Sequence, residues 1–369
     1  SRLRESLLQC CFSSRVNQMI KTKTSSIQIG DSTIGVGQPA YIIAEACENH
    51  FGDLDIAKKM IETAKECDCN AIKFQHHIPD EEMLPSVPTS ENFSEPLYDF
   101  LNRCSLSIDQ HNDLREHCID IGIEYLCTPF SYRAAVELYE IGLRTFKIGS
   151  GEMTDLPLLK AIATNLGCPM LISTGMSTLE EVDLTYGMLL DVQTPLCLLN
   201  CVSEYPPEYQ DLNLKVISEM QARYCDALIG HSDHTPDIYT SLAAVTLGAV
   251  VIEKHVTLDK SWAGPDQSVS IDFTQMTELV DGTRKIEAAL GSVKRVHEKE
   301  EQIRTWAFRS LVVNRALKVG DVLTRNDLSS KRPGTGIPSK DIAKVVGRTV
   351  ARSIPANTLL QESDLAIAD

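Results

Sequence analysis

The sequence predicts an α/β protein, a TIM (β/α)8 barrel followed by a small, mostly β domain. From about residue 41 to residue 290, short apolar runs alternate with stretches of helical periodicity. Eight such pairs fall within roughly 250 residues, which is the usual size of a TIM barrel. After residue 308 the helical periodicity stops, and short strand-like runs are separated by Gly and Pro.

Eight apolar runs are the expected strands of the barrel. They are Tyr41–Ala46, Ala71–Gln75, Glu124–Thr128, Thr145–Ile148, Met170–Ser173, Leu196–Cys201, Ala227–Gly230 and Val250–His255. The stretches between them repeat apolar residues with a helical period. The expected helices are Asp53–Glu66, Tyr132–Ile141, Leu156–Leu166, Leu179–Leu190, Leu214–Tyr224, Ile238–Leu247 and Thr274–Leu290. The long connection from Ile78 to Ser107 is rich in Pro, Ser and acidic residues, so we expect a functional or mobile loop there.

These patterns divide the chain into four parts. Residues 1–26 are basic and Ser-rich without a signal-peptide core, so we expect an N-terminal extension outside the fold, with Met19 as a candidate natural start. Residues 27–290 are the expected barrel. Residues 291–307 are highly charged and predict a linker or linker helix, and residues 308–369 form the small domain.

Composition excludes several classes of partner. The net charge of −16 argues against nucleic acid, because binding the phosphate backbone needs clustered Lys and Arg. No apolar run approaches the roughly 18 residues of a membrane-spanning helix. The twelve cysteines lie mostly alone in apolar contexts, without the spacing of a zinc site. They predict free thiols in a reducing compartment, and hence a cytoplasmic protein.

Polar residues close the expected strands. In a TIM barrel the active site lies at the carboxyl ends of the strands, so these side chains should meet at one mouth. They are Glu45, Lys73, Thr128, Lys147, Ser150, Glu152, Ser173, Ser203, Tyr205, Ser232, His234 and His255.

Two lysines predict an anion site. Lys73 and Lys147 each end an apolar strand, where a buried charge needs a partner. A phosphate or carboxylate ligand would satisfy both lysines. Hydroxyl groups at other strand ends could add hydrogen bonds, namely those of Thr128, Ser150, Ser173 and Ser232. The alternatives are internal salt bridges to carboxylates such as Glu45, or a lysine that forms a Schiff base.

Two histidines and two glutamates complete the expected chemistry. His234 and His255 close neighbouring strands about 5 Å apart, so both rings could bind one divalent cation that polarises a carbonyl. The alternative is a pair of hydrogen-bonded core histidines. Glu45 and Glu152 lie on different sides of the mouth, where one could transfer protons and the other could bind hydroxyls. Spacing leaves open which does which.

Eight short sequence strings, taken together in their order along the chain, resemble the sialic acid synthase family. They are IIAEACENH, AIKFQ, CTPF, KIGSGE, STGM, SDHT, EKHVTLDK and GPDQSVS. The tail resembles the antifreeze-like (SAF) domain of the same family. The resemblance extends from about Ile27 to the C-terminus. It implies an enzyme that joins phosphoenolpyruvate to an open-chain N-acylmannosamine-type sugar, releasing phosphate and a nonulosonic acid.

The resemblance also implies roles for individual residues. His234 and His255 would bind Mn²⁺ or Mg²⁺, and Glu45 would be the catalytic acid and base. The implied phosphoenolpyruvate ligands are Lys73, Thr128, Lys147, Ser173 and Ser232, with Ser150 and Ser203 beside them. The implied sugar ligands are Glu152, Tyr205 and Asp266. Arg332 would reach from the small domain of one subunit over the barrel of the other, which makes a domain-swapped homodimer.

Three alternatives to N-acetylneuraminate synthesis stay open. The acidic loop around residues 85–100 resembles relatives that use 2,4-diacetamido-2,4,6-trideoxymannose to make N,N'-diacetyllegionaminate. A related phosphoenolpyruvate aldolase would make a shorter keto-acid, but it would not carry the antifreeze-like tail. A sugar-binding protein without catalysis would not need two buried lysines and a histidine pair.

Overall fold

The computed structural model describes residues 26–88, 93 and 95–367 of the chain. The predicted N-terminal extension therefore lies outside the described residues, apart from Ser26. The chain divides after Leu290 into two compact units, which are described separately. Within the described ranges, no helix combines the length and apolar character that crossing a membrane requires.

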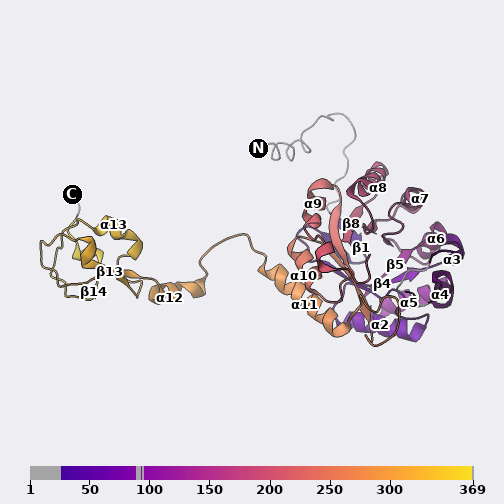
Figure 1. The fold of residues 1–369 in the computed structure, drawn as a ribbon, viewed down its shortest axis with the longest axis horizontal. Coiled ribbons are helices and arrows are strands. Elements are labelled where there is room, and N and C mark those ends of the chain that lie inside the picture. Colours follow the sequence, from indigo (N-terminus) through magenta and orange to yellow (C-terminus); the bar gives the residue numbers. More distant parts are fainter. Residues whose placement is uncertain (1–25, 89–92, 94, 368–369) are drawn as a thin grey trace. The chain divides into compact units, whose positions relative to one another are not determined.

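The first unit is a nearly closed parallel barrel, as the sequence predicts (Figure 1). Its strands follow the spatial order β5-β4-β3-β10-β9-β8-β7-β6. Their bounds are β3 Tyr41–Glu45, β4 Ala71–His76, β5 Glu124–Pro129, β6 Phe146–Ile148, β7 Met170–Ser173, β8 Leu196–Cys201, β9 Leu228–Asp233 and β10 Val251–Thr257. Each contains most of one predicted strand. Their residues are buried almost throughout, which explains why they read as continuous apolar runs.

Helices follow the strands and cover the barrel. Their bounds are α2 Leu54–Glu66, α5 Ile108–Ile121, α6 Tyr132–Glu140, α7 Leu156–Leu166, α8 Leu179–Asp191, α9 Val216–Arg223, α10 Tyr239–Thr246 and α11 Phe273–Ala289. Several begin at a residue whose side chain accepts hydrogen bonds from the first turn, such as Asp53 and Thr178. These caps fix where each loop ends, and so they help to position the loops at the barrel mouth.

The register of the sheet places site residues side by side. Glu45 on β3 pairs with Lys73 on β4 and with His255 on β10. Glu253 on β10 pairs with Ser232 on β9. These residues come from distant parts of the sequence. Strand pairing brings Glu45, Lys73 and His255 to one level of the barrel, and it places Glu253 and Ser232 two residues closer to the amino ends of the strands.

An antiparallel hairpin precedes the barrel and was not predicted. It consists of β1 Ser26–Ile29 and β2 Ser32–Gly35. Its isoleucines are buried in one cluster with residues at the beginnings of the barrel strands, including Tyr41 and Val251. The hairpin therefore covers the amino end of the barrel, and the carboxyl end is left for the site.

The long connection after β4 contains two short helices rather than the expected loop alone. These are α3 Pro79–Glu82 and α4 Leu97–Cys104. Phe100, Leu101 and Cys104 of α4 are buried, and they pack with nearby apolar residues of the same connection. The spacing of these three residues is helical, but the surrounding Pro, Ser and acidic residues obscured it in the sequence.

The second unit begins at Gly291, and its first helix is α12 Glu298–Ala307. A small domain built on antiparallel strands follows, as predicted. Its three-stranded sheet has the order β13-β12-β14, with β12 Ser310–Val313, β13 Leu328–Lys331 and β14 Thr358–Leu359. A short helix, α13 Ile342–Val345, lies between the last two strands in the sequence. A compact apolar core that includes Leu311, Val313 and Leu360 holds this domain together.

Candidate active site

A cavity of about 490 Å³ opens at the carboxyl ends of the barrel strands. Every residue of the barrel that the sequence predicted for the site lines this cavity. They are Glu45, Lys73, Thr128, Lys147, Ser150, Glu152, Ser173, Ser203, Tyr205, Ser232, His234, His255 and Asp266. Arg332 belongs to the second unit, where its Nε donates to the carbonyl of Ala307 at 3.0 Å, and its role stays a prediction.

Lys73 is buried and has partners on three strands. Its Nζ lies 2.8 Å from Glu45 Oε2, 2.8 Å from Thr128 Oγ1 and 3.8 Å from Glu253 Oε2. Burial lowers the pKa of Lys73, but Glu253 and Glu45 outweigh this and raise it above its ordinary value. The lysine is therefore charged. Its salt bridge to Glu45 is the internal ion pair that the sequence offered as an alternative to an anionic ligand.

Lys147 is equally buried but less well compensated. Its Nζ donates to Ser173 Oγ at 2.7 Å and to the carbonyl of Ile148 at 2.8 Å, and it lies 3.6 Å from Glu253 Oε1. Burial lowers its pKa, and the opposing effect of Glu253 does not restore it. An anion in the cavity would give this ammonium group the close charged partner that Glu253 provides only at longer range.

Glu253 connects the two lysines, a role that sequence analysis did not assign. It lies beside both Nζ atoms and accepts a hydrogen bond from Ser232 Oγ at 3.0 Å. Burial raises its pKa, but Lys147 and Lys73 more than offset this, so its pKa lies below the ordinary value. The signal was present in the sequence, because Glu253 is a charged residue two positions before the end of the eighth predicted strand, but nothing there showed that it faces both lysines.

Glu45 has the electrostatics of a proton-transferring group. Burial raises its pKa most, Lys73 lowers it and Glu253 raises it, with a result of about 7. Gln75 Nε2 donates to Glu45 Oε1 at 2.9 Å and holds the carboxyl group in place. A carboxyl group with this pKa can exchange a proton at neutral pH in either direction.

The two predicted histidines face each other. His234 directly follows β9 and His255 lies on β10, with ring centroids 5.0 Å apart. His234 Nδ1 donates to the carbonyl of Val202 at 2.7 Å, which leaves Nε2 available as a ligand. Burial lowers the pKa of His234, but Cys201 and the Val202 carbonyl raise it to about 9, so a cation would have to displace a proton there. The ring of Tyr205 stacks on His234, with its hydroxyl 3.3 Å from Nε2.

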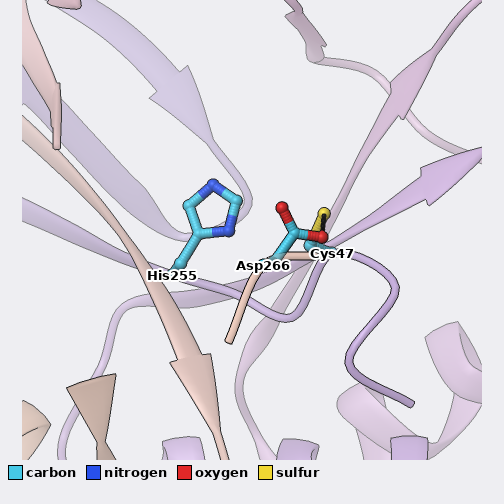
Figure 2. A group of neighbouring side chains, drawn as sticks. All are labelled: Cys47, His255 and Asp266. Atoms are coloured by element: carbon cyan, nitrogen blue, oxygen red, sulfur yellow. Dashed lines mark hydrogen bonds between the residues drawn. The ribbon is translucent and has the colours of Figure 1, made fainter. Parts of the chain in front are cut away.

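A second group of possible metal ligands shares His255. Cys47, His255 and Asp266 are all buried, and their candidate ligand atoms lie within 4.8 Å of one another (Figure 2). The thiol of Cys47 donates to Asp266 Oδ2 at 3.1 Å. This part of the mouth therefore has a donor set that fits a divalent cation. Cys47 was missed because the cysteines were all interpreted as core thiols, and the other buried cysteines among the described residues are indeed free thiols.

The side of the cavity after β6 and β7 carries hydroxyls and one carboxyl group. Ser150 Oγ accepts a hydrogen bond from the backbone of Gly175 at 3.0 Å. A Cβ at Gly175 would lie 2.1 Å from Ser203 Oγ and 2.7 Å from Ser150 Oγ, so only glycine fits between these hydroxyls. Burial raises the pKa of Glu152 to about 7. Glu152 can therefore accept or donate hydrogen bonds to a ligand's hydroxyls.

Apolar residues form one wall of the cavity, and sequence analysis did not assign them to the site. They come mainly from the long connection and include Met83, Phe93, Leu97, Phe100 and Leu101. The long connection is thus part of the site, in agreement with the expectation that it is functional.

Comparisons with known proteins agree with this architecture. Residues 60–295 match the NeuB family, and residues 308–366 match the SAF domain. The chain is 37% identical over 340 residues to N,N'-diacetyllegionaminic acid synthase of Legionella pneumophila, covering 88% of this chain and 94% of the relative. It is 36% identical over 338 residues to N-acetylneuraminate-9-phosphate synthase of Mus musculus, covering 89% of this chain and 94% of the relative.

A solved structure shows the same fold. It is the N-acetylneuraminic acid (sialic acid) synthetase of Leptospira borgpetersenii, with 32% sequence identity and a TM-score of 0.67 over 75% of this chain and 94% of that one. These relatives are named as synthases, which confirms the predictions of an enzyme and of its family. The chain therefore belongs to the NeuB family and ends in a SAF domain.

Proposed function

We propose that this protein condenses phosphoenolpyruvate with an open-chain N-acylmannosamine-type sugar and water, and releases phosphate and a nonulosonic acid. The observation that carries the proposal is the arrangement of Lys73, Lys147 and Glu45 in one cavity at the carboxyl end of the barrel. Two buried ammonium groups and a carboxyl group with a pKa of about 7 suit an anionic substrate and a proton transfer. Membership of a family whose relatives are named synthases supports it.

Phosphoenolpyruvate would bind through its phosphate and carboxylate. Lys73 and Lys147 would supply charge-assisted hydrogen bonds, which are stronger than neutral ones. Ser173 and Thr128 already accept hydrogen bonds from these lysines, and their own hydroxyl protons remain available to the ligand's oxygens. Further hydroxyls at the same mouth are those of Ser150, Ser203 and Ser232.

The reaction requires a C–C bond to form and a C–O bond to break. The C3 atom of phosphoenolpyruvate attacks the carbonyl carbon of the sugar, water adds at C2, and phosphate leaves from C2. Glu45 can take the proton of the attacking water and return a proton to the departing group. A divalent cation at His234 and His255, implied by the resemblance to be Mn²⁺ or Mg²⁺, would supply polarisation of the sugar's carbonyl group.

The sugar would lie between the phosphoenolpyruvate site and the apolar wall. Glu152, Tyr205 and Asp266 also line the cavity, and the resemblance implies that they bind the sugar's hydroxyl and amide groups. Arg332 would come from the SAF domain of a second subunit and contact the N-acyl group, which makes the complete enzyme a homodimer. A cytoplasmic location fits both the reduced thiols and the use of phosphoenolpyruvate.

The apolar wall is also compatible with a second acceptor, 2,4-diacetamido-2,4,6-trideoxymannose. Its C6 methyl group and second acetyl group would find apolar contacts with Phe93, Leu97 or Phe100. Among the described residues that line the cavity, Lys73 and Lys147 are the only lysines or arginines, and both are assigned to phosphoenolpyruvate.

Phosphate release from phosphoenolpyruvate tests the proposal. The full-length chain is incubated with Mn²⁺, phosphoenolpyruvate and either N-acetylmannosamine or 2,4-diacetamido-2,4,6-trideoxymannose. We expect phosphate and a stoichiometric nonulosonic acid with at least one sugar, and none with Glu45→Gln, which keeps the shape of the side chain. Binding of a sugar without phosphate release in the wild type would indicate a sugar-binding protein and overturn the proposal.

A further inference from the structure

The nitrogen Nδ1 of His255 is buried and has no hydrogen-bond partner among the described residues. A buried polar atom without a partner is costly, so native structures rarely keep one without a reason. The imidazole ring points a nitrogen edge toward Asp266, beside the thiol of Cys47 (Figure 2). The unpartnered nitrogen therefore faces two further groups that can bind a metal ion.

The backbone of Cys47 has a strained conformation, and its thiol is held in place by neighbouring groups. Its φ angle is +47°, in the left-handed region that glycine adopts freely and other residues rarely do. Such strain persists where the surroundings fix the side chain, and it concentrates at functional sites. The thiol is fixed on two sides, because it donates to Asp266 Oδ2 and lies 3.1 Å from the donor Nε2 of Gln75. Burial and the carboxylate of Asp266 raise the pKa of this thiol, so a cation would have to displace its proton.

We propose that Cys47, His255 and Asp266 form a ligand set for a borderline-soft divalent ion of the Zn²⁺, Co²⁺ or Fe²⁺ class. Thiolate and imidazole ligands favour these ions, whereas Mg²⁺ prefers an all-oxygen shell. When the ion binds, the thiol proton passes to solvent and a sulfur–metal bond replaces the hydrogen bond to Asp266. Nε2 of His234, on the ring that faces His255, can supply a further ligand if it exchanges its contact with the Tyr205 hydroxyl for the ion.

This inference rests on the proposed function, because the ion would serve the same carbonyl group of the sugar. It changes two expectations drawn from the resemblance. The preferred ion is softer than Mg²⁺, and Asp266 binds the ion rather than the sugar. The change originates in Cys47, since without its thiol the remaining donors are nitrogen and oxygen atoms.

Cobalt spectroscopy on the full-length chain tests the ligand set without relying on turnover. The protein is stripped with a chelator and titrated with Co²⁺ alone, because a thiolate bound to Co²⁺ gives a charge-transfer absorption in the near ultraviolet. We expect this band in the wild type and its loss in Cys47→Gly. Glycine suits the left-handed backbone at this position, so the variant should fold. Cys47→Ser, which keeps the size of the side chain, is the second variant.

Cys201→Ala is the matched control. Cys201 is also a buried thiol lining the cavity, 3.8 Å from His234 Nδ1, but it does not belong to the proposed ligand set. Cys201→Ala should keep the band, and His255→Ala should weaken it. In dialysis against Zn²⁺ and Mg²⁺ with elemental analysis, Cys47→Gly should lose at least about tenfold in Zn²⁺ affinity, since even loss of an outer partner costs that much.

The outcomes separate the two proposals. A band in the wild type that survives in Cys47→Gly, or that disappears in Cys201→Ala, overturns the ligand assignment. So does a wild type that gives no band while Mn²⁺ or Mg²⁺ supports phosphate release. A band that behaves as expected in a chain that never releases phosphate from phosphoenolpyruvate would support the metal site and refute the proposed reaction.

Discussion

Replacing Lys147 by Ala should raise the KM for phosphoenolpyruvate sharply while leaving the fold intact. The side chain is buried, and its charge lies 3.6 Å from Glu253 as its nearest carboxylate. If the phosphate or carboxylate of the substrate binds there, the variant loses one charge-assisted contact. Such a contact contributes about 1.5–3 kcal/mol. At about 1.36 kcal/mol per factor of ten, the KM should rise roughly 10- to 150-fold.

The same substitution has a structural cost that must be separated from the loss of binding. Removing one member of a buried ion pair destabilises a protein by roughly 3–5 kcal/mol when the partner is left alone. Here Glu253 keeps Lys73 at 3.8 Å and the hydroxyl of Ser232 at 3.0 Å, so the cost should fall below that range. Thermal denaturation of the variant measures this part.

Lys254→Ala is the matched control for the loss of a buried lysine. Lys254 is fully buried and follows Glu253 on β10. Its Nζ lies 3.3 Å from Asp233 Oδ2, but the residue does not line the cavity. Its removal should lower the melting temperature without changing the KM for phosphoenolpyruvate. The assay is initial-rate phosphate release at saturating sugar with varied phosphoenolpyruvate. An unchanged KM in Lys147→Ala, or an equal increase in Lys254→Ala, would refute the anion-site assignment.

Three further predictions concern the cation, the proton and the dimer. A chelator should abolish turnover, and His234→Ala and His255→Ala should each weaken metal binding in equilibrium dialysis; full activity in excess chelator would count against a metal requirement. Burial raises the pKa of Glu45 from its ordinary 4.5 to about 7 in the folded protein, so the folded state binds the proton more tightly than the unfolded state. The free energy of unfolding should therefore fall as the pH rises through this interval. Glu45→Gln should therefore remove the part of the pH dependence of unfolding between about pH 4.5 and 7, and an unchanged profile would contradict the assigned burial effect. If Arg332 acts on the partner's barrel, mixing inactive Glu45→Ala and Arg332→Ala chains should restore activity above the mean of the two homodimers, whereas no gain after verified subunit exchange would eliminate a shared site.

Much of the barrel followed from local sequence. The runs that became β7 and β8 match the prediction residue for residue, because a strand buried on both faces is apolar along its whole length. Lys73 and Lys147 were recognised for the same reason, since a charged residue at the end of such a strand stands out. The hairpin β1–β2 escaped prediction, because four-residue strands are too short to show a period.

By itself, the sequence determined which strand ends carry polar groups, because alternation of strands and helices in a barrel places those ends at one mouth. It did not determine which groups touch. Tertiary structure decided that Glu253 lies between Lys73 and Lys147, three residues from three different strands. It also decided the position of Cys47, whose left-handed backbone and contact with Asp266 join a residue after the first barrel strand to one after the last. Contacts of this kind depend on the closure of the barrel and on the direction of each side chain, and a local pattern of residues predicts neither.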